Sequence, residues 1–368
     1  PFFTQKAMFN ITMVSLSVFS VYSLSPLFTH NSLEITKGTF VKSFPRIFFN
    51  IRSLFLDQCS FSNLLGPVID SQNIQRNDIS RSIEIKDEQP SSIPQIPSND
   101  RYENINHNWT LPNEPGKVIT IINCQFLDIQ SSQYMIKSEE VTYYMSNCLI
   151  AFCKSNSKIL DLKAQYFTMT HICFYQLWCQ APGDDNTKLI EIDLKRSTFM
   201  KFLYNSFYDI SQNHNWKYGI DLQAGIPLIK CNNFTKFAVK YNVFAYISPF
   251  CFSFAMNSLS KVENNPGDIR DMKSGLFYFN FQQRKKKHAF SHCNYINCIG
   301  EQGINLFNFN ADVETVNFKS CFFDKNVGPL SRRQDISAQI TIIFDNCYLN
   351  LETGWNVGDV TITNQIES

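Results

Sequence analysis

A short cysteine motif recurs along this chain and restricts its possible folds more than any other feature. It consists of an apolar residue, two further residues, Cys, any residue and a second apolar residue. Six clear copies centre on Cys59, Cys124, Cys148, Cys293, Cys321 and Cys347. Looser copies centre on Cys173 and Cys231, and in three more copies Gly38, Ser206 and Asn257 replace the cysteine.

The spacing of these eleven anchors indicates a solenoid. Nine of the ten gaps lie between 21 and 36 residues, and eight anchors are Cys in a chain with 12 Cys among 368 residues. A period in the twenties is typical of repeat architectures, and the 34 Phe and 15 Tyr favour strands. Neither the Leu-x-x-Leu-x-Leu pattern nor the helical half of a leucine-rich repeat is present. The pattern therefore favours a parallel β-helix, with three short strands in each coil.

The residue pair before each Cys is predicted to form a corner of the coil. Asn stands there at Asn123, Asn147, Asn205 and Asn346, and Asn tolerates the left-handed backbone that such a bend requires. In the next strand, the Cys and the apolar residue two places on point into the core. Coils lie about 4.8 Å apart, so equivalent cysteines form a ladder of small, buried thiols. We expect an all-β, right-handed parallel β-helix of about eleven coils.

The Asn-Cys-x-Phe/Leu coils from Gly38 to Leu349 resemble the right-handed parallel β-helix repeats of large protist surface proteins. Those proteins are loosely akin to bacterial polymorphic outer-membrane proteins. The resemblance covers nearly the whole chain apart from its insertions. It implies exposure at the cell surface and a role in adhesion, and it supplies no catalytic residues.

The start of the chain allows two interpretations. The segment from Met8 to Pro26 is apolar with interspersed Ser, which predicts a secretory signal peptide within residues 1–25. Alternatively, residues 1–25 form a cap strand, because Met13 to Leu24 largely alternates apolar residues with Ser. Residues 26–368 are predicted to be one β-helix domain. No other stretch reaches the roughly 18 apolar residues that span a bilayer, so membrane association would need a segment outside this chain.

Three polar insertions interrupt the coils. The largest, residues 71–117, has mixed charge and five prolines, which predicts a mobile excursion from one coil. Shorter insertions run from Ala181 to Lys188 and from Ser260 to Gly275. Insertions at a similar phase of a solenoid emerge on one flank. We expect these lateral loops to share a flank and to bind the partner, a protein or a glycan.

Charge argues against a nucleic-acid partner. The chain has 33 basic and 32 acidic residues, so no global field attracts a polyanion. The basic run from Arg284 to His288 lies between two strand-like segments and is predicted to decorate a coil connection.

Cysteine spacing argues against a metal site or a cofactor. The chain has no C-x-x-C pair, and its six histidines show no metal-ligand spacing. Ladder thiols are predicted to stay reduced, because their parallel side chains disfavour bonding. If the protein is secreted, the remaining cysteines Cys153, Cys179, Cys251 and Cys298 are candidates for disulfide bonds.

Carboxylates provide the only enzymatic alternative. Cleavage of a polysaccharide needs paired carboxylates, and a lyase needs acidic residues on one strand face with a basic partner. The sequence offers Asp184 and Asp185 in a Gly-Asp-Asp turn, and Glu191 and Asp193, which alternate along a strand. The companion motifs of polygalacturonase-like enzymes are absent.

The leading hypothesis is therefore a non-enzymatic, secreted or surface-exposed β-helix scaffold that binds a protein or glycan. Asn108 and Asn233 are predicted N-glycosylation sites in that setting, as is Asn10 if it is not removed with a signal peptide. A polysaccharide lyase or glycoside hydrolase of the β-helix type is one alternative. An intracellular structural protein, to which reduced thiols are suited, is the other.

Overall fold

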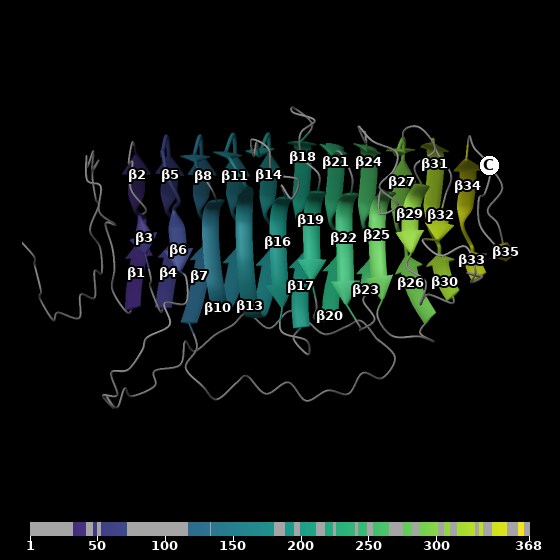
Figure 1. Cartoon of the computed structure of the whole chain (residues 1–368), viewed down its shortest axis with the longest axis horizontal. Helices are drawn as coiled ribbons and strands as arrows, with labels where there is room; N and C mark the ends of the chain where they lie inside the picture. The colour runs from purple at the N-terminus through teal and green to yellow at the C-terminus, as the bar shows by residue number, and fades with distance from the viewer. Residues whose placement is uncertain are drawn as a thin grey trace, which may run out of the picture.

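The computed structural model of the chain describes eighteen segments. They are residues 32–41, 47–49, 53–71, 117–132, 134–179, 188–194, 199–210, 218–223, 226–239, 242–248, 253–264, 275–281, 287–300, 305–309, 315–327, 331–333, 341–351 and 360–363. Strands follow one another along a single axis from β1 to β35 (Figure 1). Every pairing between described strands is parallel, and eleven successive coils each contribute one short strand to the same sheet. The predicted parallel β-helix is thereby confirmed.

Each coil contains two strands of one continuous sheet, which bends into two faces. Face A consists of the first halves of β10 (Tyr134–Ser146) and β13 (Lys158–Thr170), together with β3 (Phe48–Phe49), β6 (Ile69–Ser71), β16 (Lys188–Leu194), β19 (Tyr218–Gln223), β22 (Asn242–Ser248), β25 (Gly275–Phe281), β29 (Asn305–Phe309) and β32 (Ser331–Arg333). Face B consists of the second halves of β10 and β13, together with β1 (Ser32–Thr36), β4 (Ser53–Asp57), β7 (Lys117–Ile122), β17 (Phe199–Leu203), β20 (Ile226–Lys230), β23 (Ser253–Ala255), β26 (Lys287–Ser291), β30 (Thr315–Lys319), β33 (Thr341–Asp345) and β35 (Val360–Thr363).

Face C is the sheet of short strands that contains the cysteine motif. Its strands are β2 (Thr39–Val41), β5 (Ser60–Ser62), β8 (Gln125–Leu127), β11 (Leu149–Ala151), β14 (Cys173–Tyr175), β18 (Ser206–Ile210), β21 (Asn233–Val239), β24 (Ser258–Asn264), β27 (Asn294–Ile296), β31 (Phe322–Asn326) and β34 (Tyr348–Leu351), with β28 (Ile299–Gly300) beside β24. A smaller sheet of β9 (Gln130–Ser131), β12 (Lys154–Ser155) and β15 (Trp178–Cys179) follows face C in three coils.

A left-handed residue bends each coil between faces B and C. These first-corner residues, with φ between 45° and 60°, are Lys37, Gln58, Asn123, Asn147, His171, Tyr204, Cys231, Met256, His292, Ser320 and Asn346. Positive φ is uncommon outside glycine, with Asn and His among the enriched exceptions. The corner predicted before each ladder residue is therefore present in all eleven coils.

The residue after each first corner points into the core and forms the first ladder. Its members are Gly38, Cys59, Cys124, Cys148, Ile172, Asn205, Asn232, Asn257, Cys293, Cys321 and Cys347. Backbone bonds link neighbouring rungs: Gln125 N–H donates to the Cys59 carbonyl at 2.8 Å, and Tyr348 N–H donates to that of Cys321 at 3.0 Å. The predicted column of cysteines is confirmed.

The predicted phase is wrong in three consecutive coils. Ile172, Asn205 and Asn232 occupy the ladder, not Cys173, Ser206 and Cys231. Asn205 was expected at a corner, but it is buried and Tyr204 makes the bend. A cysteine or serine happens to lie beside the ladder position in these coils, and the sequence pattern alone does not distinguish the two places.

Asparagine fits the ladder because its amide satisfies two backbone groups at the corner. Asn232 Oδ1 accepts from Asn205 N–H at 2.9 Å, and Asn232 Nδ2 donates to the Phe202 carbonyl at 2.9 Å. Asn257 repeats both bonds one coil further on, with the backbone N–H of Asn232 and the carbonyl of Ile229. A buried N–H or C=O without a partner costs about 1–3 kcal/mol, so each such Asn removes two penalties.

Cysteine makes the same contacts less strongly. Cys148 Sγ lies 3.4 Å from Cys124 N, and Cys347 Sγ lies 3.2 Å from the Phe318 carbonyl oxygen. A thiol is a weaker donor and acceptor than an amide, but it is apolar enough to be buried without penalty. The recurrent Cys is therefore a small core residue that also caps the bend.

Two places beyond the ladder, large apolar residues fill the coil. Phe61 stacks on Phe126 with ring centroids 4.9 Å apart, and Phe207 stacks on Phe234 at 5.0 Å. Tyr295 and Phe323 continue this column at 4.7 Å near the C-terminal end. Each fully buried aromatic side chain contributes roughly 1.5–3 kcal/mol, which helps to offset the entropy lost by a long, thin fold.

A second left-handed residue follows or bends the face C strand in nine coils and forms a second corner. Its residues are Asn63, Asp128, Phe152, Gln176, Asp209, Lys236, Lys261, Asn297 and Lys325, and the buried residues that follow them form a second ladder. This ladder contains Cys153 and Cys298, which the sequence analysis wrongly placed outside any ladder. They lie five coils apart, about 24 Å, which excludes a disulfide between them.

The described cysteines are all free. Nine of these eleven are buried, Cys179 among them, and only Cys173 and Cys231 are partly accessible. Burial raises the pKa of Cys153 and of Cys298 to about 12, which keeps both thiols protonated. Cys251 lies outside the described residues.

The strands beside the insertions show where these enter the coil. Lys188, after the second insertion, pairs with Tyr218, which pairs with Asn242. Gly275, the last residue of the third insertion, begins the next strand of the same sheet, because Phe277 on that strand pairs with Phe244. The second and third insertions therefore end at the same corner of the coil. Lys117, after the first, pairs with Val141 in the middle of β10. The first insertion therefore enters at a different corner, contrary to our expectation that all three share a flank. Residues 1–31 and 72–116 lie outside the described residues.

We predict that Asn232→Ala lowers the free energy of unfolding by about 2–4 kcal/mol, because two buried backbone groups lose their partners. The matched control is Asn233→Ala, which removes the same kind of side chain at the next position, where it is exposed to solvent. Urea denaturation followed by circular dichroism measures both variants. Equal loss in the two variants would contradict a capping role for the ladder.

We also predict that, among the described cysteines, iodoacetamide modifies Cys231 and Cys173 first in the native protein. The nine buried thiols should react only in denaturant, since access requires opening of a coil. Peptide mass spectrometry over a time course resolves each site. Early modification of Cys124 or Cys321 would contradict the inward orientation of the ladder.

Candidate functional site

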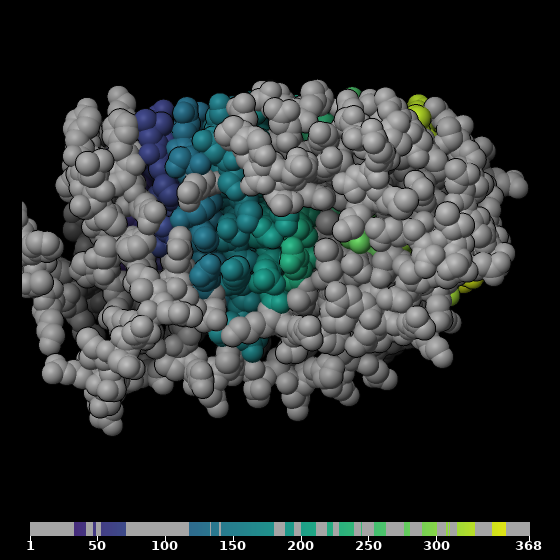
Figure 2. Space-filling model, viewed as in Figure 1, coloured from purple at the N-terminus to yellow at the C-terminus, as the bar shows by residue number. Residues whose placement is uncertain are grey.

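The candidate carboxylates of the sequence analysis are only partly placed. Glu191 and Asp193 lie on β16, with alternate residues of that strand buried in the core. Asp184, Asp185 and the predicted glycosylation site Asn108 lie outside the described residues. The strands β10, β13, β16 and β19 lie side by side (Figure 1), and this part of the chain forms the teal region of Figure 2.

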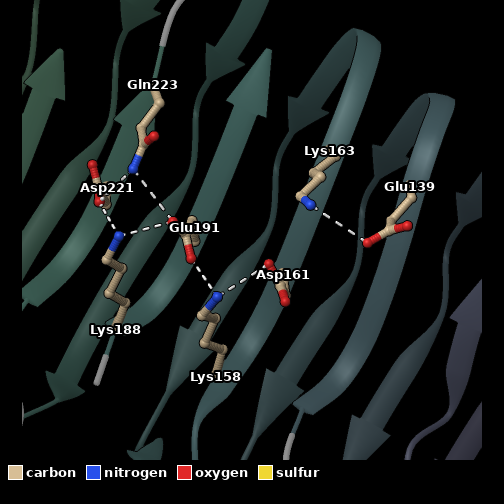
Figure 3. A network of polar contacts seen from close by, with 8 residues as sticks. All are labelled: Glu139, Lys158, Asp161, Lys163, Lys188, Glu191, Asp221 and Gln223. Carbon is tan, nitrogen blue, oxygen red and sulfur yellow. Dashed lines mark hydrogen bonds and ion pairs between the residues drawn. The ribbon is translucent and has the colours of Figure 1, made fainter. Parts of the chain in front are cut away.

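Glu191 lies at the centre of a network of ion pairs on the outer side of face A (Figure 3). It pairs with Lys158 and, at 2.8 Å, with Lys188. Lys158 also contacts Asp161 at 3.2 Å, and Lys188 also pairs with Asp221.

Strand register places these charges in columns. Asp161, Glu191 and Asp221 are direct partners on β13, β16 and β19, so three carboxylates stack coil upon coil. Like charges at this spacing would repel. Lys158 and Lys188 lie beside the column and offset the repulsion, while Gln223 donates to Glu191 at 3.3 Å and to Asp221 at 3.2 Å.

The network determines the protonation of its members. Burial alone would raise the pKa of Glu191, but hydrogen bonds and charge from Lys158 and Lys188 outweigh it, and the pKa is lowered. Burial would lower the pKa of both lysines, yet their carboxylate partners raise it. Asp193 differs: burial raises its pKa, and nearby Lys163 opposes the shift only partly.

These side chains are paired and mostly sheltered. The five ion-paired side chains, Lys158, Asp161, Lys188, Glu191 and Asp221, are each only 7–20% exposed, so substrate has little access to them. Among the described residues, no group of three or more His, Cys, Asp or Glu is arranged to hold a metal ion. The arrangement therefore holds three coils in register more readily than it performs acid–base chemistry.

A shallow hollow opens where face C meets the sheet of β9, β12 and β15. Its volume is about 350 Å³, and it is lined by Asp128, Gln130, Phe152, Lys154 and Trp178. Such a volume is at the lower end of ligand pockets. Gln130, Lys154 and Trp178 form one outward column, since Lys154 pairs with both of the others.

Two aromatic side chains form the apolar part of this hollow. Trp178 packs partly against the core, which fixes its position. Phe152 occupies a second corner, where 39% of the residue is exposed. A carboxylate, an amide and an ammonium group surround them, so the hollow offers apolar surface together with both hydrogen-bond donors and acceptors.

Aromatic residues continue from the hollow across the outer side of face C. The Phe152 ring meets Tyr175 edge-on at 5.2 Å, and Tyr175 stacks on Tyr208 at 5.7 Å. Lys236 Nζ lies 5.3 Å from the Tyr208 ring centroid in the next coil. The surface thus extends over four successive coils, roughly 14 Å.

Sequence reasoning did not identify this hollow. It assigned Phe and Tyr to the core, as their frequency suggested, and it did not consider outward aromatics. The available signal was Trp178, one of only four Trp, placed three residues before the second insertion. Its partners Lys154 and Gln130 are recognised only once the register of the coils is known.

The other sequence candidates lie apart from the hollow. His171 and His292 occupy first corners, and His171 stacks on Tyr204 at 4.9 Å. Residues 284–286 of the basic run lie outside the described residues. Asn233 is exposed on β21, and its Oδ1 accepts a hydrogen bond from the Thr235 hydroxyl at 3.0 Å within the sequon.

Comparisons with known proteins identify no relative: no family model, no curated protein and no solved structure matches this chain. In the described residues, no helix has the length and apolar character needed to cross a membrane.

We predict that Glu191→Gln destabilises the protein by about 1–3 kcal/mol at neutral pH, because two lysines lose a shared partner. The lowered pKa of Glu191 means that its contribution is present above its ordinary value of 4.5 and is lost as the pH falls through the folded-state pKa. The difference in melting temperature between wild type and variant should therefore vanish in acid. Glu139→Gln is the matched control, since Glu139 pairs at 3.5 Å with a Lys163 side chain that is 58% exposed. An equal effect of the two substitutions would contradict a central role for Glu191.

Proposed function

We propose that this protein is a non-enzymatic β-helix scaffold that binds a neutral glycan in the hollow of Phe152 and Trp178. The observation that supports the proposal is the combination of two accessible aromatic rings with Asp128, Gln130 and Lys154 in one hollow. Of the two partner classes expected from the sequence, a glycan matches this chemistry better than a protein does.

The chemistry of the hollow matches a sugar ring. A pyranose has an apolar face of C–H groups, and the negative face of an aromatic ring attracts such groups. Its hydroxyls need donors and acceptors at the rim, which Lys154, Gln130 and Asp128 supply. One acid and one base leave the hollow without net charge, and this favours a neutral ligand over a sulfated or uronic one.

The solenoid repeat also suits an extended glycan. Coils follow one another at about 4.8 Å, which is close to the length of one pyranose unit. Tyr175 and Tyr208 lie in the two coils beyond Phe152, so successive sugars of one chain would meet successive aromatic rings. Rigid strands hold these rings, which reduces the entropy lost on binding.

We predict that Trp178→Ala weakens binding of a neutral oligosaccharide at least about tenfold, as expected for an aromatic anchor. A glycan array selects the oligosaccharide, and isothermal titration calorimetry measures its affinity. Phe152→Ala should have a similar effect.

The matched control is Phe322→Ala. Phe322 is 36% exposed on the same face and stacks on Tyr348 at 4.5 Å, but it lies far along the axis from the hollow. Equal loss in the control, or binding of proteins alone, would contradict the proposed site. New reducing ends in the bound glycan would instead favour the polysaccharide-cleaving alternative.

Secretion or display at the cell surface belongs to the same proposal. It is supported by the exposed sequon at Asn233 and by the burial of nine thiols, which protects them from oxidation. We predict that the protein from its native cells carries an N-glycan at Asn233, and that Asn233→Gln removes the corresponding shift on electrophoresis. An unmodified Asn233 together with a cytosolic location would favour the intracellular alternative.

A further inference from the structure

Three first corners in succession present residues that bind soft metal ions. Cys231, Met256 and His292 occupy the corners of coils that are adjacent along the axis. Backbone bonds hold the coils together at these points: Cys231 N–H donates to the Ala255 carbonyl at 3.2 Å, and Met256 N–H donates to that of Ser291 at 2.9 Å. The three side chains therefore form one outward column.

The two sulfur atoms already lie at a suitable separation for a shared ion. Cys231 Sγ is 3.8 Å from Met256 Sδ. Metal–sulfur bonds of about 2.3 Å that meet at angles of about 109–120° place the sulfurs about 3.7–4.0 Å apart. Very little movement would be needed for both to bind the same ion.

Access and chemistry agree with this geometry. Met256 is 49% exposed, Cys231 is partly buried, and His292 is exposed. A thiolate, a thioether and an imidazole are soft or borderline ligands, whereas Mg²⁺ and Ca²⁺ prefer oxygen. The spacing of these residues in the sequence does not indicate a metal site, because they come from three different coils.

We infer that Cys231, Met256 and His292 form a binding site for a soft monovalent ion, Cu(I) being the physiological candidate. The ion binds Cys231 Sγ and Met256 Sδ, and His292 is its third ligand. Binding displaces one proton from the thiol to solvent and changes no oxidation state, so the resulting thiolate–Cu(I) unit is neutral.

The test titrates the folded, reduced protein with Cu(I) under argon, with bicinchoninate as the competing chelator. We expect each protein molecule to take one Cu(I) ion from the chelator and bind it at Cys231, Met256 and His292. Cys231→Ser should abolish this binding, Met256→Leu should weaken it at least about tenfold, and His292→Ala should also weaken it. Ag(I) is a redox-inert second probe, and circular dichroism confirms that each variant stays folded.

The matched control is Cys173→Ser. Among the described cysteines, Cys173 is the other partly accessible thiol, but its column neighbours are Leu149 and Ser206, which provide neither thioether nor imidazole. This variant should bind Cu(I) like the wild type. X-ray absorption of the wild-type complex should show two sulfur ligands and one nitrogen ligand.

Two results would overturn the inference. The first is no Cu(I) transfer to the folded wild-type protein. The second is an affinity unchanged by Met256→Leu, which would mean that Cys231 acts as an isolated thiol.

Discussion

The left-handed corner is the constraint on which the rest of this structure depends. A parallel coil must bend sharply between faces B and C, and each bend takes one N–H and one C=O out of the sheet ladder. In the interior these groups need partners. The ladder residue supplies them from the next coil, as Asn232 does for the Asn205 N–H and the Phe202 carbonyl. Where the ladder residue is Asn or Cys, the contact that satisfies a corner is therefore also a contact between stacked coils.

This constraint explains why both Cys and Asn occur in one column. Both are small, and both place a donor and an acceptor near the corner, with Asn the stronger and Cys the less costly to bury. The sequence was sufficient to predict the parallel coils and their number, because eight cysteines marked the period. It was not sufficient to predict the phase at Asn205 and Asn232, since Ser206 and Cys231 lie one place away and match the pattern equally well. The second ladder was missed for a related reason: its residues, such as Leu64 and Phe237, are ordinary core residues.

Side chains that point outward do not have to satisfy buried backbone groups, so residues at equivalent outward positions can differ from one coil to the next. Face A carries Asp161, Glu191 and Asp221, which are tolerable in one column only because lysines lie beside them. Glu191 was identified from the sequence as one of an alternating pair. Of its two lysine partners, Lys188 lies three residues earlier on the same strand, whereas Lys158 comes from the preceding coil and is recognised only once the register is known. Trp178 and Phe152 could not be paired in advance, because the residues between coils vary in number and the register is set by the buried ladder. Buried positions can therefore be predicted from the sequence, whereas the columns of surface residues can be identified only from the stacked coils.

The hollow of Phe152 and Trp178 and the column of Cys231, Met256 and His292 are built in the same way at different places. Each brings together outward side chains from successive coils. The hollow lies at second corners and on β9, β12 and β15, in the coils that contain Asp128, Phe152 and Gln176. The sulfur column lies at first corners, in the coils of Cys231, Met256 and His292. In both, rigid backbone bonds fix residues from separate coils at the spacing of one strand, about 4.8 Å, before any ligand arrives. Since a solenoid transmits contacts mainly between neighbouring coils, substitutions in one surface should leave the other intact, and the two ligands can be studied in the same molecule without interference.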